Sequence, residues 1–236
     1  FKATVMQKVN MLRSMEVGDP EYFKLKTWVD GFMRIPFGVN KALSINIKDG
    51  IENCSLFMEN AKKTLDECVY GLDNAKMQIM QLIGQWITNP NATGTSIAIK
   101  GPMGTGKTTL VKEGISKILG RDFAFIALGG ATDSSFLEGH SYTYEGSTWG
   151  KIVDVLMETQ CMNPIIFIDE LDKISKTENG KEIIGILTHL TDSSQNDEFC
   201  DKYFSGIKFD LSKALFIFSY NDYNLLDPIL ADRIHT

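Results

Sequence analysis

The segment "GPMGTGKTT", residues 101–109, matches the pattern GxxxxGK[ST] of a phosphate-binding loop. It follows the apolar run "SIAIK" and precedes a stretch with helical apolar spacing, the context in which this motif works. Its glycines let successive backbone N–H groups converge on phosphate oxygens at a helix N-terminus, while Lys107 reaches the β and γ phosphates and Thr108 ligates Mg²⁺. An accidental glycine-rich turn is the competing interpretation, and the flanking strand and helix signals disfavour it. We therefore expect an ATP and Mg²⁺ site lined by the whole loop: Gly101, Pro102, Met103, Gly104, Thr105, Gly106, Lys107, Thr108 and Thr109.

Two adjacent acids follow the apolar run "PIIFIDE", residues 164–170. This arrangement fits a Walker B motif, in which Asp169 holds the hydration shell of Mg²⁺ and Glu170 orients and polarises the attacking water. The same pair could instead open a helix as an N-cap with a favourable charge. The buried strand that leads into the pair, together with the phosphate-binding loop, favours the Walker B interpretation.

Two further polar residues stand where such a site needs them. Asn221 follows the apolar run "ALFIFS" and can hold the lytic water or the γ-phosphate, or can simply form a turn. Arg233 ends "LDPILADR" and is either a surface cation near a helix C-terminus or an arginine finger that reaches the γ-phosphate of a neighbouring subunit. The second role requires an oligomer.

The remaining reactive residues indicate no other chemistry. No arrangement of the three histidines with Ser or Cys suggests a pair of nucleophile and base, and the four cysteines show no metal-binding spacing. We expect the cysteines to be reduced thiols of an intracellular, soluble, cytoplasmic protein.

The order of elements predicts an α/β fold. Residues 1 to about 90 show helical patterns, among them "GDPEYFKLKTWVDGFMRIPFG", with Asp19 as N-cap and Gly38 closing the element, and helices over 50–69 and 72–88. Beyond residue 94, apolar runs that suit strands buried on both faces alternate with helices near 107–119, 147–160 and 179–191. We expect a P-loop three-layer α/β/α sandwich with a parallel sheet over 66–236, preceded by a helical N-terminal extension or linker over 1–65.

Composition narrows the class of protein further. The chain has 236 residues, 43% hydrophobic and 23% charged, which is typical of a globular protein with a sizeable core. Its net charge of -6 argues against an unspecific grip on nucleic acid, although a local basic groove stays open. No apolar run is long enough to span a membrane. The chain begins without methionine and stops shortly after a helical pattern, so we expect it to be a piece of something longer.

The loop "GHSYTYEGSTWGK", residues 139–151, combines glycines with Tyr142, Tyr144 and Trp149. Permissive backbone and large flat side chains suit the gripping of something variable. The alternative is a surface loop whose aromatic side chains fold back onto the domain.

Taken with these motifs, the chain resembles the AAA+ ATPase region of Lon proteases. The segments that carry the resemblance cover nearly the whole chain: "DPEYFKLKTWVDGFMRIPFG", "YGLDNAKMQIMQ", "GPMGTGKTTL", "LGG", "EGHSYTYEGSTWGKI", "NPIIFIDELDKI", "SSQNDEFCDKYF", "FDLSKALFIFS" and "ILADR". It implies an ATPase that moves unfolded polypeptide through the pore of a homohexamer for proteolysis, with a helical lid and a Ser-Lys protease domain outside these residues.

The resemblance also implies residue roles. Tyr70, Gly71 and Leu72 would border the adenine pocket. Asn221 would be sensor 1 and Arg233 the arginine finger. Tyr144, followed by Glu145, would be the pore-loop aromatic that contacts the polypeptide.

Departures from the family pattern mark a divergent member. Glu145 stands where the family has an aliphatic residue, and Ser141 and Tyr142 replace basic residues. The acid motivates an alternative function, a stand-alone AAA+ ATPase that remodels proteins or handles nucleic acid without a protease. A third interpretation, an assembly module that binds ATP without turnover, is disfavoured by the intact pair of Asp169 and Glu170.

Overall fold

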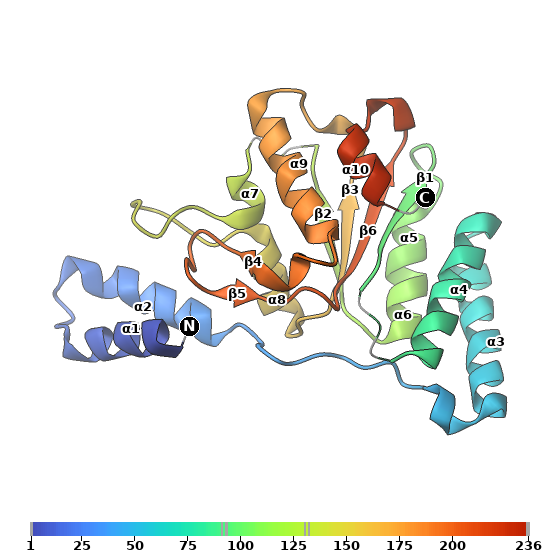
Figure 1. Cartoon of the computed structure of the whole chain (residues 1–236), viewed down its shortest axis with the longest axis horizontal. Coiled ribbons are helices and arrows are strands. Elements are labelled where there is room, and N and C mark those ends of the chain that lie inside the picture. Colours follow the sequence, from blue (N-terminus) through green and yellow to red (C-terminus); the bar gives the residue numbers. More distant parts are fainter. Residues whose placement is uncertain (1, 91, 93, 130, 132, 235–236) are drawn as a thin grey trace.

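The computed structural model describes residues 2–90, 92, 94–129, 131 and 133–234. Its central element is a four-stranded sheet in the order β1–β6–β3–β2, in which every neighbouring pair is parallel (Figure 1). The strands are β1 (Ser96–Lys100), β2 (Phe123–Ala127), β3 (Ile165–Asp169) and β6 (Leu215–Tyr220). They coincide with the four apolar runs of the sequence, so the predicted α/β fold with a parallel sheet is confirmed.

The strands are apolar throughout because both faces of the sheet are covered. Along β3, Ile166 and Ile168 belong to one buried cluster, while Ile165 and Phe167 belong to a second. Alternate side chains of a strand point to opposite faces, so the two clusters are the two sides of the sheet. This explains why these strands show no alternation of polar and apolar residues.

Helices form the outer layers of the sandwich. One face carries α3 (Ile51–Cys68), α4 (Asp73–Thr88) and a continuous helix over 107–119, made of α5 (Lys107–Thr109), the π-helical turn η2 (Leu110–Ile115) and α6 (Ser116–Leu119). The other face carries α7 (Ser135–Glu138), α8 (Lys151–Thr159), α9 (Glu178–Thr191) and α10 (Pro228–Arg233). Short 3-10 turns connect them: η1 (Ile47–Asp49), η3 (Leu171–Lys173), η4 (Asn196–Glu198) and η5 (Tyr223–Leu225).

An N-terminal hairpin of α1 (Lys2–Ser14) and α2 (Pro20–Met33) lies at one side of the sandwich (Figure 1). Asp19 caps α2 as predicted, its side chain accepting a hydrogen bond from the Glu21 amide at 2.9 Å. The buried face of α2 joins the core: Trp28 stacks parallel to Phe32, and its indole N–H donates to the Tyr203 carbonyl at 3.1 Å. The hairpin is thus tied to the sandwich by aromatic packing.

Two predicted helix limits are wrong. Helix α2 ends at Met33 and does not continue to Gly38, because Pro36 disfavours helical backbone at the residue before it. Helix α8 begins at Lys151 and not near 147, because the backbone of Gly150 is extended (φ -80°, ψ 169°) and its N–H is held by Asp201 at 2.8 Å. That carboxylate lies 51 residues away in the sequence, so the apolar pattern of the helix does not reveal it.

Two features of the fold were not predicted or stay undecided. A hairpin of two very short strands, β4 (Phe199–Cys200) and β5 (Lys208–Phe209), lies beside the sandwich. The predicted division at residues 65 and 66 falls inside α3, and it stays a proposal. None of the helices in the described residues is both long and apolar enough to cross a membrane.

Candidate functional site

The phosphate-binding loop leaves β1 at the carboxyl edge of the sheet. Its first residue stays joined to the neighbouring strand, because the Gly101 N–H donates to the Tyr220 carbonyl at 3.2 Å. Gly104 (φ 77°) and Gly106 (φ 85°) adopt left-handed backbone that other residues rarely tolerate. A side chain at Gly106 would also press against Val69, 3.1 Å away. These two positions therefore need glycine for the loop to curl.

The loop leads directly into the helix over 107–119. Lys107 is its first residue and is buried. The Nζ atom of Lys107 donates to the Gly101 carbonyl, to the Pro102 carbonyl at 3.0 Å and to the Asn221 side-chain oxygen at 3.3 Å. The lysine thus lies across the concave side of the loop, where a phosphate would meet both its charge and the free N–H groups of the first helical turn.

The two acids lie at the end of β3, level with the phosphate-binding loop. Asp169 accepts hydrogen bonds from the Ser219 hydroxyl on β6 and from the Glu170 amide at 2.9 Å. Glu170 has left-handed backbone (φ 64°), and its side chain makes no capping bond to the turn that follows. It forms an ion pair with Lys173 instead, a contact that raises the pKa of the lysine. Glu170 therefore does not make the hydrogen bond that the N-cap interpretation requires.

The position of the Glu170 carboxylate depends on Gly129, which lies in the loop after β2, the strand next to β3. Gly129 follows β2, and a Cβ atom at that position would overlap Oε2 of Glu170. The absence of a side chain at Gly129 leaves room for the carboxylate. Of the described glycines, Gly129 is the one whose added Cβ atom would lie closest to Glu170.

A single cavity of about 410 Å³ brings the motifs together. Its lining residues come from three places in the sequence: Met103, Gly104, Thr105, Gly106, Lys107, Thr108, Thr109, Asp169, Glu170 and Asn221. They meet because the carboxyl ends of β1, β3 and β6 lie at the same edge of a parallel sheet. Gly101 and Pro102 stand at the entrance of the loop and contact the cavity through Lys107.

Other predicted residues lie outside this cavity. Tyr70 is fully exposed, and Gly71 and Leu72 have left-handed backbone just before α4. The same segment reaches the phosphate-binding loop through Val69, which packs against Gly106. These contacts put residues 70–72 at the rim of the loop, and no described contact of theirs forms an adenine pocket.

Arg233 is also separate from the cavity. It lies at the end of α10, partly exposed, and its guanidinium pairs with Asp192 at 2.6 Å. The hydroxyl of Ser194 and the Arg233 charge hold the pKa of Asp192 far below its usual range. Arg233 therefore has no contact with the phosphate-binding loop of its own chain in the described contacts.

The donor set of the cavity fits a nucleotide with Mg²⁺. Thr108 and Asp169 both line it and supply a hydroxyl and a carboxylate oxygen, the hard ligands that Mg²⁺ prefers. The glycine conformations leave backbone N–H groups free of side-chain crowding on the phosphate side. A bound Mg²⁺ would neutralise charge on the phosphate oxygens.

The loop over residues 139–150 is firmly held at both ends. The buried Asp201 accepts from the Gly150 amide at 2.8 Å and the Tyr203 amide at 2.8 Å, and burial raises its pKa to about 7. Gly139 has no room for a side chain, because a Cβ there would lie 2.7 Å from the Gly150 nitrogen. The base of the loop is thus a close backbone contact fixed by one carboxylate.

The three aromatic residues of this loop differ in their environments. Tyr142 packs edge-on against Tyr203, with ring centroids 5.6 Å apart, and Trp149 stacks on Phe204 at 6.0 Å. Tyr144 is 68% exposed, and Glu145 beside it is exposed as well. Two of the predicted contact residues therefore fold back onto the domain, and one stands free at the tip.

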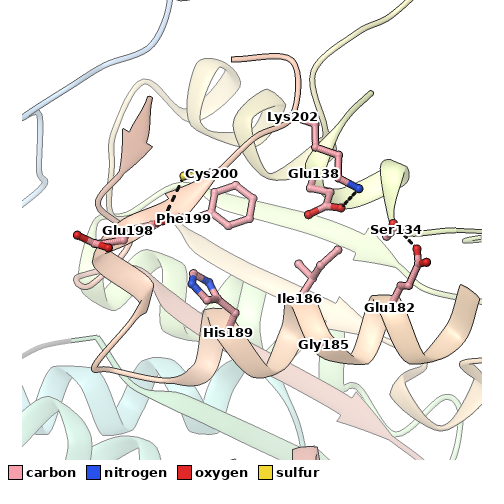
Figure 2. Close-up of a pocket in the computed structure, with 10 residues that line it drawn as sticks. All are labelled: Ser134, Glu138, Glu182, Gly185, Ile186, His189, Glu198, Phe199, Cys200 and Lys202. Atoms are coloured by element: carbon pink, nitrogen blue, oxygen red, sulfur yellow. Dashed lines mark hydrogen bonds and ion pairs between the residues drawn. The ribbon is translucent and has the colours of Figure 1, made fainter. Parts of the chain in front are cut away.

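A larger open concavity, of about 560 Å³, lies between α7, α9 and β4 (Figure 2). Figure 2 shows Glu138 facing Lys202 and Ser134 facing Glu182, and both pairs are in contact. His189 also lines this concavity, away from the phosphate-binding loop. The acids that line it already have partners: Glu138 pairs with Lys202, Glu182 with Ser134 and Glu198 with Lys208.

Several residues that shape the site were not singled out from the sequence. Ser219 bonds Asp169, Asp172 bonds the backbone after β6, and Asp201 fixes the loop base. Ser219 and Asp172 stand within three residues of a predicted site residue, which is the signal that would have found them. Asp201 had no such signal, because its partner lies 51 residues earlier.

Comparisons with known proteins agree with this geometry. The family model described as "ATPase family associated with various cellular activities (AAA)" matches residues 97–236. The chain is 38% identical to a "Lon protease homolog" of Acanthamoeba polyphaga mimivirus, 33% identical to "Lon protease homolog, mitochondrial 1" of Dictyostelium discoideum and 32% identical to "Lon protease" of Chlamydia pneumoniae. These alignments cover 99%, 99% and 98% of this chain but 23%, 23% and 26% of the relatives, so the chain spans about a quarter of their length. The resemblance predicted from the motifs is confirmed.

Proposed function

The chain belongs to the AAA family of ATPases, and on this premise we propose that it is the Mg-ATP-hydrolysing motor of a Lon-type protease. In this proposal, hydrolysis drives the unfolding and translocation of a polypeptide toward a protease domain. The names of the relatives support the proteolytic part, since three of them are called Lon protease or Lon protease homolog. Because the chain spans about a quarter of those relatives, the activity of the whole protein is part of the proposal.

The observation that carries the proposal is the shared cavity. It brings Lys107 and Thr108 within one concave surface with Asp169, Glu170 and Asn221. Phosphoryl transfer needs mostly positioning and charge stabilisation, and these residue types supply both. The same side chains spread over the surface would have no common substrate.

Each side chain has a defined task at the phosphates. Lys107 binds the β and γ phosphates, and Asn221, which already contacts the Lys107 ammonium, holds the γ-phosphate or the lytic water from the opposite side. Thr108 and Asp169 would hold Mg²⁺. Glu170 orients the water and takes up its proton, a step that requires the Glu170 carboxylate to leave its ion pair with Lys173 or to share it.

Self-association as a homohexamer is the second element of the proposal. Arg233 stands outside the cavity of its own chain, where a trans-acting arginine has to stand. Its pairing with Asp192 keeps the guanidinium oriented on the surface of α9 and α10. A neighbouring copy would then receive this charge at its γ-phosphate.

The substrate of the motor is unfolded polypeptide. The exposed Tyr144 at the tip of the braced loop supports this assignment, because an exposed aromatic ring on a rigid base grips apolar chain without reading its sequence. Glu145 would add a preference for basic segments. We place the protein in an intracellular, cytoplasmic compartment, with nucleic acid as a less favoured partner because of the net charge of -6.

The test uses the full-length protein that contains this chain. We expect ATP hydrolysis that depends on Mg²⁺ and ATP-dependent degradation of a fluorescently labelled unfolded protein. The variant Glu170→Gln should bind ATP but lose both activities, while Glu158→Gln, on the exposed part of α8, should keep them. Hydrolysis and remodelling without degradation would support the stand-alone ATPase instead, and stimulation by single-stranded DNA would support its nucleic-acid form. ATP binding without any turnover would overturn the motor altogether.

A further inference from the structure

Asp172 links the end of β3 to the segment that follows β6. It lies in η3, three residues after the last residue of the strand, and its Oδ2 atom accepts hydrogen bonds from two successive backbone amides. These are the amides of Asn221, at 3.3 Å, and of Asp222, at 3.2 Å. One carboxylate oxygen therefore holds the backbone of the residue whose side chain enters the nucleotide cavity.

The held segment has only one other tie to the cavity in the described contacts. That tie is the hydrogen bond that the side-chain oxygen of Asn221 accepts from Lys107 at 3.3 Å. The nearby hydrogen bond between Ser219 and Asp169 belongs to β6, because Ser219 is the residue before the last one of that strand. Ser219 fixes the strand itself, which its pairing with β1 already holds in register. Beyond Tyr220 the sheet no longer constrains the backbone, so the direction of Asn221 depends on Asp172.

Stability alone does not account for a carboxylate at this position. The second oxygen, Oδ1 of Asp172, is fully buried and has no hydrogen-bond partner among the described residues. Burying an oxygen in this way opposes folding. A carboxylate offers stronger hydrogen bonds to N–H groups than a neutral oxygen does, which is useful where the backbone must be held firmly.

We propose that Asp172 is a positioning residue for ATP hydrolysis, which sets the place of the Asn221 amide relative to Glu170 by holding the backbone of residues 221 and 222. Asp172 and Glu170 belong to the same turn after β3. The Glu170 carboxylate and the Asn221 amide, on either side of the attacking water, would therefore both be positioned by this one short segment. The inference rests on the proposed function, since it assigns a role within the same hydrolytic site.

The experiment compares Asp172→Asn and Asp172→Ala in the full-length protein with the native protein. We expect kcat for ATP hydrolysis to fall about 10-fold to 100-fold in Asp172→Ala, as for a misplacement of about 1 Å, with KM for ATP and the affinity for a fluorescent ATP analogue within about twofold. Asp172→Asn keeps one oxygen acceptor and should recover part of the loss. The matched control is Asp210→Asn. The Asp210 carboxylate also accepts a hydrogen bond from a backbone amide, that of Ser212, but it lies before the start of β6, at the opposite end of the strand from the cavity.

A double variant separates positioning from general damage. Asp172→Ala combined with Asn221→Ala should hydrolyse ATP no more slowly than Asn221→Ala alone, because the residue to be positioned is then gone. Additive losses, or a parallel loss of ATP affinity, would overturn the proposal. If Asp172→Ala does not fold, Asp172→Asn and the same cycle decide the question.

Failure of the proposed function would look different. In that case Asn221→Ala would hydrolyse ATP normally or the native protein would not hydrolyse it at all. Hydrogen exchange of the amides of residues 221 and 222 is measured alongside, and it should accelerate in both Asp172 variants whatever the activity. Unchanged exchange would show that Asp172 does not hold this backbone and would overturn the proposal by itself.

Discussion

The Nζ atom of Lys107 lies 3.3 Å from the side-chain oxygen of Asn221, although 114 positions separate them in the sequence. One residue begins the helix after β1 and the other follows β6, and β1 and β6 are neighbours in the sheet. The contact therefore spans the cavity at the place where the γ-phosphate is proposed to bind. A ligand that takes up the charge of Lys107 would compete with Asn221 for it, so binding at the loop would change the contacts of Asn221.

Replacement of Lys107 by alanine should abolish ATP binding. The substitution removes the charge and three hydrogen bonds, two to carbonyls of the loop and one to Asn221, while the glycines that shape the loop remain. We expect a loss of at least about 100-fold in affinity for a fluorescent ATP analogue, as for removal of a charged partner from a buried site. The control is Lys112→Ala, an exposed lysine on the same helix. Retained affinity in Lys107→Ala would contradict the assignment of the phosphate-binding loop.

Replacement of Gly129 by alanine should slow hydrolysis without weakening the fold. The new Cβ would overlap Oε2 of Glu170, and because that oxygen is the far end of a flexible side chain, the carboxylate moves and the backbone does not. We expect kcat to fall about 10-fold to 100-fold, with ATP affinity and the melting temperature nearly unchanged. The control Gly185→Ala adds the same methyl group where nothing lies within 4 Å. A normal kcat in Gly129→Ala would mean that the observed position of Glu170 is not the one used in hydrolysis.

The sequence predicted which residues meet in the cavity better than it predicted their surroundings, for a physical reason. Four apolar runs predict strands buried on both faces. In a parallel sheet the residues that follow such strands meet at one edge, so Lys107, Asp169 and Asn221 could be grouped before any contact was known. The environments of Tyr142, Tyr144 and Trp149 could not be assigned in this way. Tyr142 and Trp149 pack on partners in α1, α2 and the segment after β4, which no local pattern connects with the loop, while Tyr144 is left exposed.

Stability should decrease with rising pH because of Asp201. Burial, reinforced by the charge of Glu138, raises its pKa from the ordinary 3.8 to about 7 in the folded chain, although hydrogen bonds from three backbone amides lower it. A carboxyl group with a raised folded pKa favours the fold while protonated, so its contribution is present below about pH 4 and is lost as the pH rises through 7. The free energy of unfolding should fall by at most about 1.4 kcal/mol per pH unit in this window.

Urea denaturation at pH 5, 6, 7 and 8 measures this effect as a difference between the native chain and Asp201→Asn. The difference is needed because other ionisable groups also contribute to the pH dependence of stability. We expect the variant to lack the part of the slope that Asp201 contributes. Parallel slopes for the two proteins would show that Asp201 is ionised throughout this range.

Replacement of Tyr144 by alanine should separate hydrolysis from translocation. The side chain is 68% exposed and lies outside the nucleotide cavity, so basal ATP hydrolysis by the full-length protein should change by less than about twofold, as expected for an exposed residue. Unfolding of a tagged fluorescent protein should be strongly impaired, because the exposed ring that is proposed to grip the chain is gone. Glu145→Ile should raise the rate for acidic substrates relative to basic ones. Unchanged unfolding in Tyr144→Ala would remove this loop from the substrate path.

Tyr142 should brace this loop against the N-terminal hairpin through its ring and not through its hydroxyl. The Nζ atoms of Lys8 and Lys24 lie 4.3 Å and 4.9 Å from the ring centroid, and Lys24 also donates to the Thr143 carbonyl at 3.4 Å. Lys8 is partly buried, and this burial together with the charge of Lys24 lowers its pKa. A partly buried ammonium group gains more from a ring face than an exposed one does.

Hydrogen exchange of the amides of residues 143–148 measures the bracing directly. Tyr142→Leu should accelerate exchange by about 10-fold, the equivalent of one or two lost cation–π contacts. Tyr142→Phe should leave exchange unchanged, because it keeps the ring face. Joint replacement of Lys8 and Lys24 by methionine should reproduce the effect of Tyr142→Leu, since the methionines keep the apolar stems but remove the charges. Normal exchange in that double variant would mean that the edge-on contact with Tyr203 anchors Tyr142 without the lysines.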